Sequence, residues 1–238
     1  FTGADSWNSV YGELKFRPIV NANLQLYESV YRADGAVYYP EIAHLPIEAD
    51  GDAGLFETFT GALHGVRLSG GRVRGGGNVG ALIGTVSGSV SIENCRVYLD
   101  PSEVESKLNE KEDYWLEGGV TGGLVGFVDW RGSVDVTTSF AATVLHGTTA
   151  TGGLVGSARG GFAVQRSYAD CYLYSDTQTG GLVGASIGTS AVTLTNCYAA
   201  GFQKAPDMAG IAMGSVVRMT NCYSANSPLL GTLTYSTS

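Results

Sequence analysis

Short apolar runs bounded by glycine recur along most of this chain. The string Gly-Gly-Leu-Val-Gly occurs at residues 122–126 and returns at residues 152–156 and 180–184. A weaker copy spans residues 79–84, and a degraded copy spans residues 209–213. From residue 126 onward, the closing positions of the copies lie 30, 28 and 29 residues apart. This regular spacing indicates a repeat architecture.

A second string follows each copy of the first at a nearly fixed offset. It reads Asn-Cys-Tyr-Ala at residues 196–199 and Asn-Cys-Tyr-Ser at residues 221–224, with variants at 92–95, 136–141 and 164–169. Runs this short and rich in Val, Ile, Leu, Thr and Tyr are typical of β-strands. A short strand cannot bury its apolar side alone, but equivalent strands stacked about 4.8 Å apart can. The pattern therefore predicts a parallel β-solenoid.

The second string also predicts a corner in each coil. Ile92 and Cys95 lie three positions apart, so strict alternation would place them on opposite faces. A left-handed residue at Asn94 would bring both inside, and asparagine tolerates that conformation. The side chains expected inside are Ile92, Cys95, Val97, Cys197 and Ala199, and those expected outside are Arg96, Tyr98 and Tyr198.

We therefore expect an all-β protein, a parallel β-helix of about six coils, formed by residues 53–238. Residues 1–52 show no clear repeat and are predicted to form an N-terminal capping segment, because an open sheet edge invites aggregation. Residues 100–117 interrupt the repeat and predict a short helical insertion. Asp100 suits the N-cap, Pro101 the first helical position, and Glu103 completes a capping box.

The two strings resemble the GLUG-motif repeats of bacterial surface and secreted proteins. The resemblance covers about residues 53–227. Such repeats look like right-handed β-helix coils, and they occur in adhesin-like proteins and in the non-catalytic parts of IgA-protease-family peptidases. The resemblance implies an extracellular or bacterial cell-surface location and an adhesive or spacer role, and it supplies no catalytic residue.

The charge and hydropathy of the chain argue against nucleic acid and the membrane interior as partners. The formal net charge is −8, and no cluster of basic residues offsets it, so we expect no nucleic-acid binding. No apolar run reaches the roughly 18 residues of a membrane-spanning helix, so no direct membrane insertion is expected. Because the chain starts at Phe1 without a signal peptide, we expect it to be part of a longer surface-attached protein.

The chemistry-bearing residues predict no enzyme and no cofactor. The three histidines form no His-Glu-x-x-His motif, and the glycines at 75–80 lack the lysine of a phosphate loop. No two carboxylates of the repeat region occupy one position in adjacent coils. Glu48, Asp50 and Asp52 place oxygen ligands at alternate positions and are a weak Ca²⁺ candidate, although a solvated acidic turn is the favoured interpretation.

The cysteines share a repeat position with serines. Cys95, Cys197 and Cys222 stand where other coils have Ser139 and Ser167. This exchange predicts a slot for a small buried side chain and free thiols. A disulfide between Cys197 and Cys222 in neighbouring coils is the alternative, although parallel Cβ vectors disfavour it.

Four aromatic residues also share one repeat position: Phe140, Tyr168, Tyr198 and Tyr223. If they face outward, they form a continuous stripe that could bind a partner. The favoured alternative is a self-stacking ladder that stiffens the rod.

The leading functional hypothesis is a non-catalytic, adhesin-like module that displays a binding surface for a host glycan or a host surface protein. Two alternatives remain open. One is a polysaccharide-active β-helix enzyme, and the other is a passive spacer within a larger surface protease.

Overall fold

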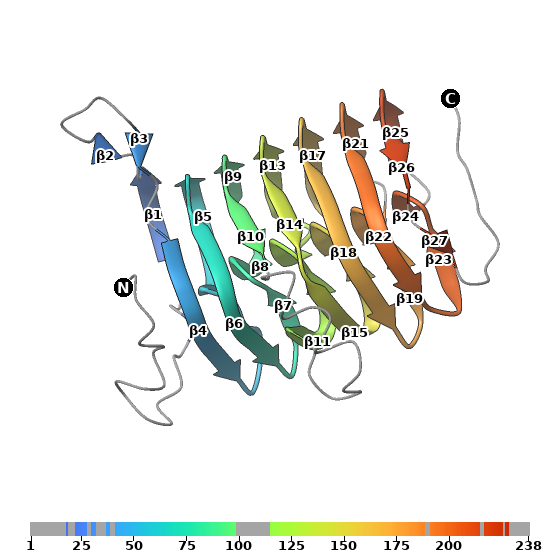
Figure 1. Ribbon diagram of the computed structural model, residues 1–238, viewed down its shortest axis with the longest axis horizontal. Coiled ribbons are helices and arrows are strands. Elements are labelled where there is room, and N and C mark those ends of the chain that lie inside the picture. The colour runs from blue at the N-terminus through green and yellow to red at the C-terminus, as the bar shows by residue number, and fades with distance from the viewer. Residues whose placement is uncertain are drawn as a thin grey trace.

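The computed structural model describes residues 41–98, 115–188, 191–214 and 217–225 in full, together with Pro18 and the backbone of β1, β2, β3 and β27. The described chain winds into about six coils, and all strand pairs between coils are parallel. Figure 1 shows these coils stacked along the long axis, from blue at the N-terminal side to red at the C-terminal side. The predicted all-β solenoid is confirmed.

Each coil contributes strands to three faces, which we call A, B and C. Face A is a 13-stranded sheet, and faces B and C share the long strand β5 (Phe56–His64) within one 12-stranded sheet. Face B contains β8 (Ile83–Val86), β12 (Val125–Val128), β16 (Val155–Ala158), β20 (Val183–Ser186) and β24 (Ala212–Gly214). Face C contains β1 (Ala22–Tyr27), β9 (Ser89–Glu93), β13 (Ser133–Thr137), β17 (Gly161–Gln165), β21 (Val192–Thr195) and β25 (Val217–Thr220).

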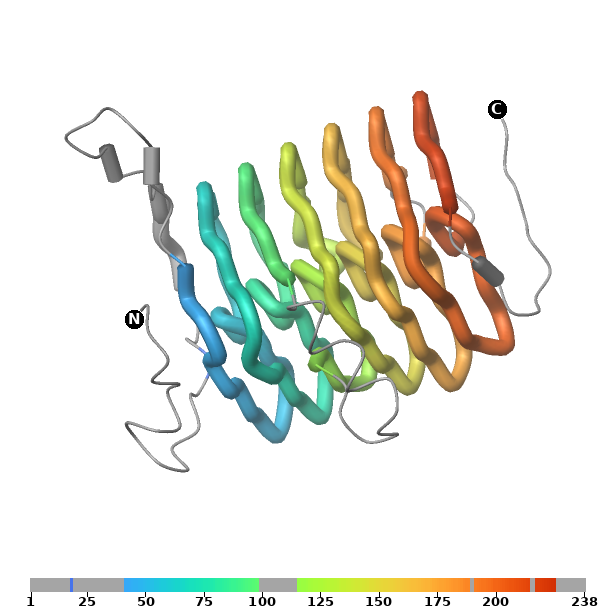
Figure 2. The backbone as a smooth tube through the Cα atoms, viewed as in Figure 1, coloured from blue at the N-terminus to red at the C-terminus, as the bar shows by residue number. Residues whose placement is uncertain are grey.

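Face A collects the remaining strands of the coils. They are β4 (Glu41–Ala49), β6 (Arg67–Gly75), β7 (Asn78–Gly80), β10 (Arg96–Tyr98), β11 (Leu116–Gly122), β14 (Phe140–Ala142), β15 (Val144–Gly152), β18 (Tyr168–Ser175), β19 (Gln178–Gly180), β22 (Tyr198–Lys204), β23 (Asp207–Ala209), β26 (Tyr223–Ser224) and β27 (Ser227–Pro228). The short strands β2 (Val30–Tyr31) and β3 (Val37–Tyr38) pair with each other as an antiparallel hairpin outside the coils. The tube in Figure 2 shows how regularly one coil follows the next.

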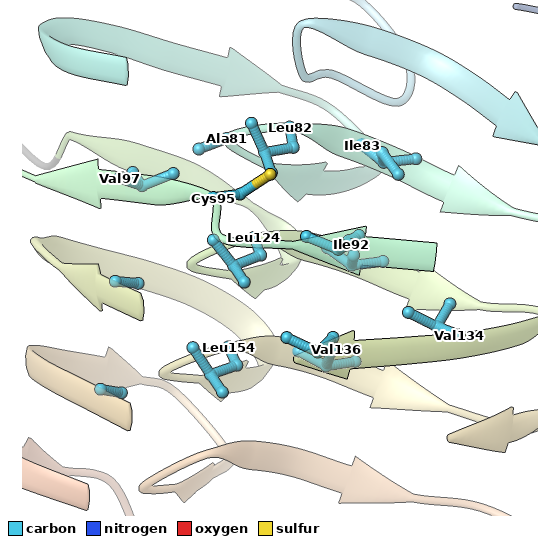
Figure 3. Packing of buried hydrophobic residues seen from close by; sticks show 14 of the residues in the cluster. Ala81, Leu82, Ile83, Ile92, Cys95, Val97, Leu124, Val134, Val136 and Leu154 are labelled. Carbon is cyan, nitrogen blue, oxygen red and sulfur yellow. The ribbon is translucent and has the colours of Figure 1, made fainter. Parts of the chain in front are cut away.

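The core runs along the inside of the solenoid as stacked columns of apolar side chains. The leucine of each Gly-Gly-Leu-Val-Gly string is fully buried, and so is the valine that follows it. Figure 3 shows Leu82, Leu124 and Leu154 one above another, beside Ile92 and Val136. Each coil therefore buries its apolar side against the coils before and after it, which is how short strands become stable in a solenoid.

The predicted corner is confirmed at Asn94, whose φ of 52° lies in the left-handed region. The face C strands that precede this corner pair in register from coil to coil. The corner residues therefore form one column. That column contains Gly65, Asn94, Thr138, Arg166, Asn196 and Asn221, all with φ between 48° and 71°. The amides of Asn196 and Asn221 also pair, with an Nδ2–Oδ1 distance of 3.1 Å. The inward and outward placements predicted around this corner hold, with Cys95 and Ala199 buried and Tyr198 exposed.

Thr138 is the least suited side chain in the corner column, because a β-branched residue at a φ of 50° is strained. We expect Thr138→Asn to raise the free energy of unfolding by about 1 kcal/mol. Urea denaturation of both proteins, followed by circular dichroism, measures the change. The same substitution at Thr137, which lies in β13 and outside the left-handed region, serves as the control and is expected to give no gain. Equal midpoints for Thr138→Asn and the unsubstituted chain would contradict the claim that the backbone of Thr138 is strained.

Two strands before residue 53 extend the faces by one layer. β4 pairs in parallel with β6 on face A, and β1 pairs in parallel with β5 on face C. The solenoid sheets therefore reach into the segment 1–52, and its role as a cap stays a prediction.

The predicted helical insertion at 100–117 is wrong at its end. Leu116 and Glu117 belong to strand β11, where they pair with β6 on one side and β15 on the other. Residues 99–114 lie outside the described part. The register shows that residues 99–115 stand where the next coil has only Thr143 and Val144. Over the described ranges, no helix is long and apolar enough to cross a membrane.

Candidate functional site

The four cysteines are free, as the serine exchange predicts for Cys95, Cys197 and Cys222. Cys95 and Cys197 are buried with Ser139 and Ser167 between them in the column, whereas Cys222 in the last coil is only partly buried. Each side chain of this column contacts the backbone carbonyl two residues earlier. The thiol and the hydroxyl therefore make the same contact at the corner. The distances are 3.4 Å from Cys95 Sγ to Glu93 O, 2.9 Å from Ser139 Oγ to Thr137 O, and 2.8 Å from Ser167 Oγ to Gln165 O.

Burial also makes the thiols of Cys95, Cys171 and Cys197 poor nucleophiles. Loss of solvation raises the pKa of the Cys95 thiol from 9.0 to about 12. The same cause raises the pKa of the Cys171 thiol to about 12 and raises that of Cys197. A nucleophilic cysteine needs a lowered pKa and access to solvent, so these three residues are structural.

The predicted aromatic residues lie in one column on the outer surface of face A. Phe140, Tyr168, Tyr198 and Tyr223 pair in register across four coils. The rings of Phe140 and Tyr168 stack with centroids 4.8 Å apart and an interplanar angle of 7°. Those of Tyr168 and Tyr198 stack at 4.8 Å and 4°. We call these four residues the aromatic ladder.

The ladder offers different surfaces along its length. Its inner rings cover each other's faces, so Phe140 and Tyr168 are only partly exposed and present mainly ring edges. Arg96, the preceding member of the column, lies over the Phe140 ring at 5.5 Å from its centroid. Tyr198 and Tyr223 are 41% and 65% exposed. The ladder therefore combines the two arrangements considered from the sequence. Its rings stack on one another in the middle, and its C-terminal end presents an accessible aromatic surface.

A second aromatic group lies beside the ladder and was missed by sequence reasoning. Phe202 packs against Tyr172 and Tyr174, with centroid distances of 6.4 Å and 5.8 Å and tilted rings. Tyr172 and Tyr174 also pack against buried Trp115 and Val144. The signal that could have found this group is the alternation in β18, where the outward positions hold Tyr168, Asp170, Tyr172 and Tyr174.

The coils nearer the N-terminus carry a charged cleft on face A. An open cleft of about 580 Å³ runs across β4, β6, β11 and β15, and glycines form much of its lining. Glu48, Arg74, Glu117 and His146 line it from successive coils, and Thr148 lies at one end. The cleft and the two aromatic groups lie on the same face of the rod.

Ion pairs hold the charged side chains of the cleft in place. Arg74 Nε lies 2.9 Å from Glu117 Oε2, and Arg72 Nη2 lies 3.1 Å from Glu48 Oε1. His146 Nε2 also lies within hydrogen-bonding distance of Asp176 Oδ1 of the next coil, at 3.5 Å. Such partly exposed pairs add little stability but orient the groups that a polar ligand would meet.

The candidate calcium ligands do not converge on one point. Glu48 pairs with Arg72, while Asp52 accepts hydrogen bonds from the backbone N–H of Asn78 at 2.7 Å and the Thr85 hydroxyl at 2.5 Å. Asp50 is exposed. Over the described ranges, no group of three or more His, Cys, Asp or Glu side chains could hold a metal ion. The structure thus gives the calcium hypothesis no support.

The described chain defines a parallel β-solenoid with an aromatic and charged outer face. Among solved structures it is similar to a protein from Bacteroides ovatus whose assignment as an immunoglobulin A1 protease is provisional. The TM-score is 0.51 and the identity 16%, over 88% of this chain and 68% of that one. A second structure, described as IgA1 protease, has a TM-score of 0.48 and 19% identity, over 77% of this chain and 16% of that one.

The likeness to the Bacteroides ovatus protein shows the fold alone, because the identity is only 16%. No protein-family model matches the chain, so the GLUG resemblance stays an expectation from the sequence. No curated protein matches it either.

Proposed function

We propose that this chain is a non-catalytic, adhesin-like module of a longer bacterial surface protein, and that the outer surface of face A binds a host glycan. One observation carries the proposal. The register places the exposed rings of the ladder, the tilted rings around Phe202 and the charged cleft on one continuous face. The solenoid positions these groups on rigid strands, which suits a recognition surface.

The chemistry of this face fits a sugar better than a protein partner. A pyranose ring has an apolar side that packs on aromatic rings, and hydroxyls that bond to carboxylates and guanidinium groups. Exposed Tyr198 and Tyr223 offer the first kind of contact. Glu117, Arg74 and Thr148 in the cleft offer the second. Ligand sites of this kind combine aromatic walls with a few placed polar groups.

A glycan array probed with the 238-residue chain tests the proposal, and calorimetry on the best oligosaccharide gives the affinity. We expect the double substitution Tyr198→Ala and Tyr223→Ala to weaken binding at least about tenfold, because exposed tyrosines are frequent binding hot spots. Thr220→Ala, which changes an exposed residue of face C in the last coil, is the matched control. An array without any bound glycan would support a passive spacer. Equal affinity in the double variant would contradict a binding site at Tyr198 and Tyr223.

A second function has one observation in its favour. Glu48 and Glu117 lie two strands apart on either side of Arg74 in the cleft, a separation of roughly 10 Å between strands. This backbone spacing is slightly above the separation of about 6.5–9.5 Å between the carboxyl groups of inverting glycosidases. Release of reducing ends from a panel of polysaccharides, abolished by Glu117→Gln, would establish an enzyme and overturn the non-catalytic proposal.

A further inference from the structure

The turn between β12 and β13, residues 129–132, carries two residues more than its neighbours. Val128 pairs with Val86 and Ala158, and Ser133 pairs with Ser89 and Gly161. Between these fixed points, the coils on either side have two residues each, at 87–88 and 159–160, and this coil has four. The coil closes without the extra pair, so the pair is not needed to form the solenoid.

The extra residues are held in a defined shape. The Gly132 N–H donates to the Asp129 carbonyl at 2.8 Å, which closes a β-turn around Trp130 and Arg131. The Trp130 N–H donates to the Asp129 carboxylate at 2.7 Å. Gly160 of the next coil packs directly against this turn, because a Cβ there would lie 2.1 Å from the Gly132 carbonyl. A turn braced in this way loses little freedom when a ligand binds.

The turn presents an aromatic ring and positive charge to solvent. Trp130 is 64% exposed, and the guanidinium of Arg131 lies 4.3 Å from its ring centroid. Arg159, exposed at the same turn of the next coil, lies 6.0 Å from the Phe127 ring. Within the described part of the chain, neither guanidinium makes a salt bridge. Tryptophan and arginine are the residue types most enriched at binding hot spots, so this exposed pair on a braced turn points to a binding role.

We propose that Trp130, Arg131 and Arg159 form a binding site for an acidic sugar, separate from face A and independent of its function. Guanidinium groups bind carboxylate and sulfate through paired hydrogen bonds, and the indole face packs on a sugar ring. The nearby carboxylates argue for a ligand of low charge. Asp129 lies in the turn and Asp135 is exposed on β13, so a densely anionic membrane or peptide would be repelled.

Calorimetry on the 238-residue chain tests this site with three probes: a sialylated trisaccharide, a sulfated disaccharide and neutral lactose. We expect one or both acidic probes to bind and lactose to bind at least about tenfold more weakly. The comparison of the two acidic probes identifies carboxylate or sulfate as the preferred group. Equal binding of all three probes, or binding of none, would overturn the proposal.

Matched variants locate the site. Trp130→Ala and Arg131→Gln should each weaken acidic-sugar binding about tenfold, whereas Arg218→Gln, an exposed arginine on β25, should leave it within twofold. Substitution of both Tyr198 and Tyr223 should also leave it unchanged, which separates this site from face A. Thermal melts confirm that the variants fold. Unchanged acidic-sugar binding in Trp130→Ala, or binding to phosphatidylserine vesicles lost in that variant, would refute the assignment to an acidic sugar.

Discussion

Gly152→Ala is expected to lower the free energy of unfolding by about 3 kcal/mol, because the new methyl group has no space. A Cβ at Gly152 would lie 2.0 Å from the Val155 carbonyl oxygen and 2.4 Å from the Gly184 amide nitrogen. Both contacts are with backbone, which cannot move without breaking the ladder between coils. Equivalent Gly122 and Gly180 face the same carbonyl of their own coil, at 2.0 Å and 1.9 Å.

Gly161→Ala is the matched control for this prediction. Its Cβ would meet only the Ser133 side chain at 3.8 Å, which is ordinary contact. Urea denaturation of the two variants and the unsubstituted chain, at one pH, gives the comparison. We expect the midpoint of Gly161→Ala to stay close to the unsubstituted value and that of Gly152→Ala to fall sharply. Equal midpoints for the two variants would show that the turn between β15 and β16 can shift enough to accommodate the new methyl group.

The close approach at Gly152 explains why the repeat was readable from the sequence. The first glycine of each string lies where face A folds onto face B, and the leucine two positions later points into the core. Backbone contact at every coil forces the same small residue to return at the same interval. The corner after β9 could be predicted for a similar reason. Few residue types tolerate the left-handed conformation that Asn94 adopts there.

The outer surface of face A was harder to predict from the sequence. It depends on how the strands on either side of residues 99–115 pair with their neighbours. Trp115 takes its place beside the ring of Tyr172 only because Leu116 pairs with Leu145 and Val73. The sequence favoured a helical insertion over residues 100–117, and that expectation concealed the start of β11 at Leu116. The cleft was hidden in the same way, since it joins Glu48 and Glu117 from strands on either side of β6.

The ladder itself shows how a repeat can serve structure and recognition together. Stacked rings at one position per coil gain from contact with each other wherever the coil spacing of about 4.8 Å applies. The same stacking removes ring faces from solvent, so most of the ladder could not pack against a sugar. Only Tyr198 and Tyr223 retain large exposed areas, which is why the binding test is placed on them.

Raising the pH is expected to destabilise the fold through its buried thiols. The pKa of Cys95 is about 12 in the folded chain because burial disfavours the thiolate, against 9.0 for an ordinary cysteine. The folded state therefore keeps its proton where the unfolded state loses it. This contribution to stability is fully present below pH 9 and is lost as the pH rises through about 12, at about 1.4 kcal/mol per pH unit.

Two substitutions in one column isolate this effect from other groups that titrate in the same range. Cys95→Ser removes a buried thiol, and serine is accepted there because Ser139 makes the same contact with the carbonyl two residues earlier. Ser167→Cys adds one. Urea midpoints measured from pH 7 to 11 should fall less steeply for Cys95→Ser and more steeply for Ser167→Cys than for the unsubstituted chain. Three parallel curves would mean that the thiol of Cys95 ionises as readily in the folded coil as in the unfolded chain, and that the column does not exclude the charged form.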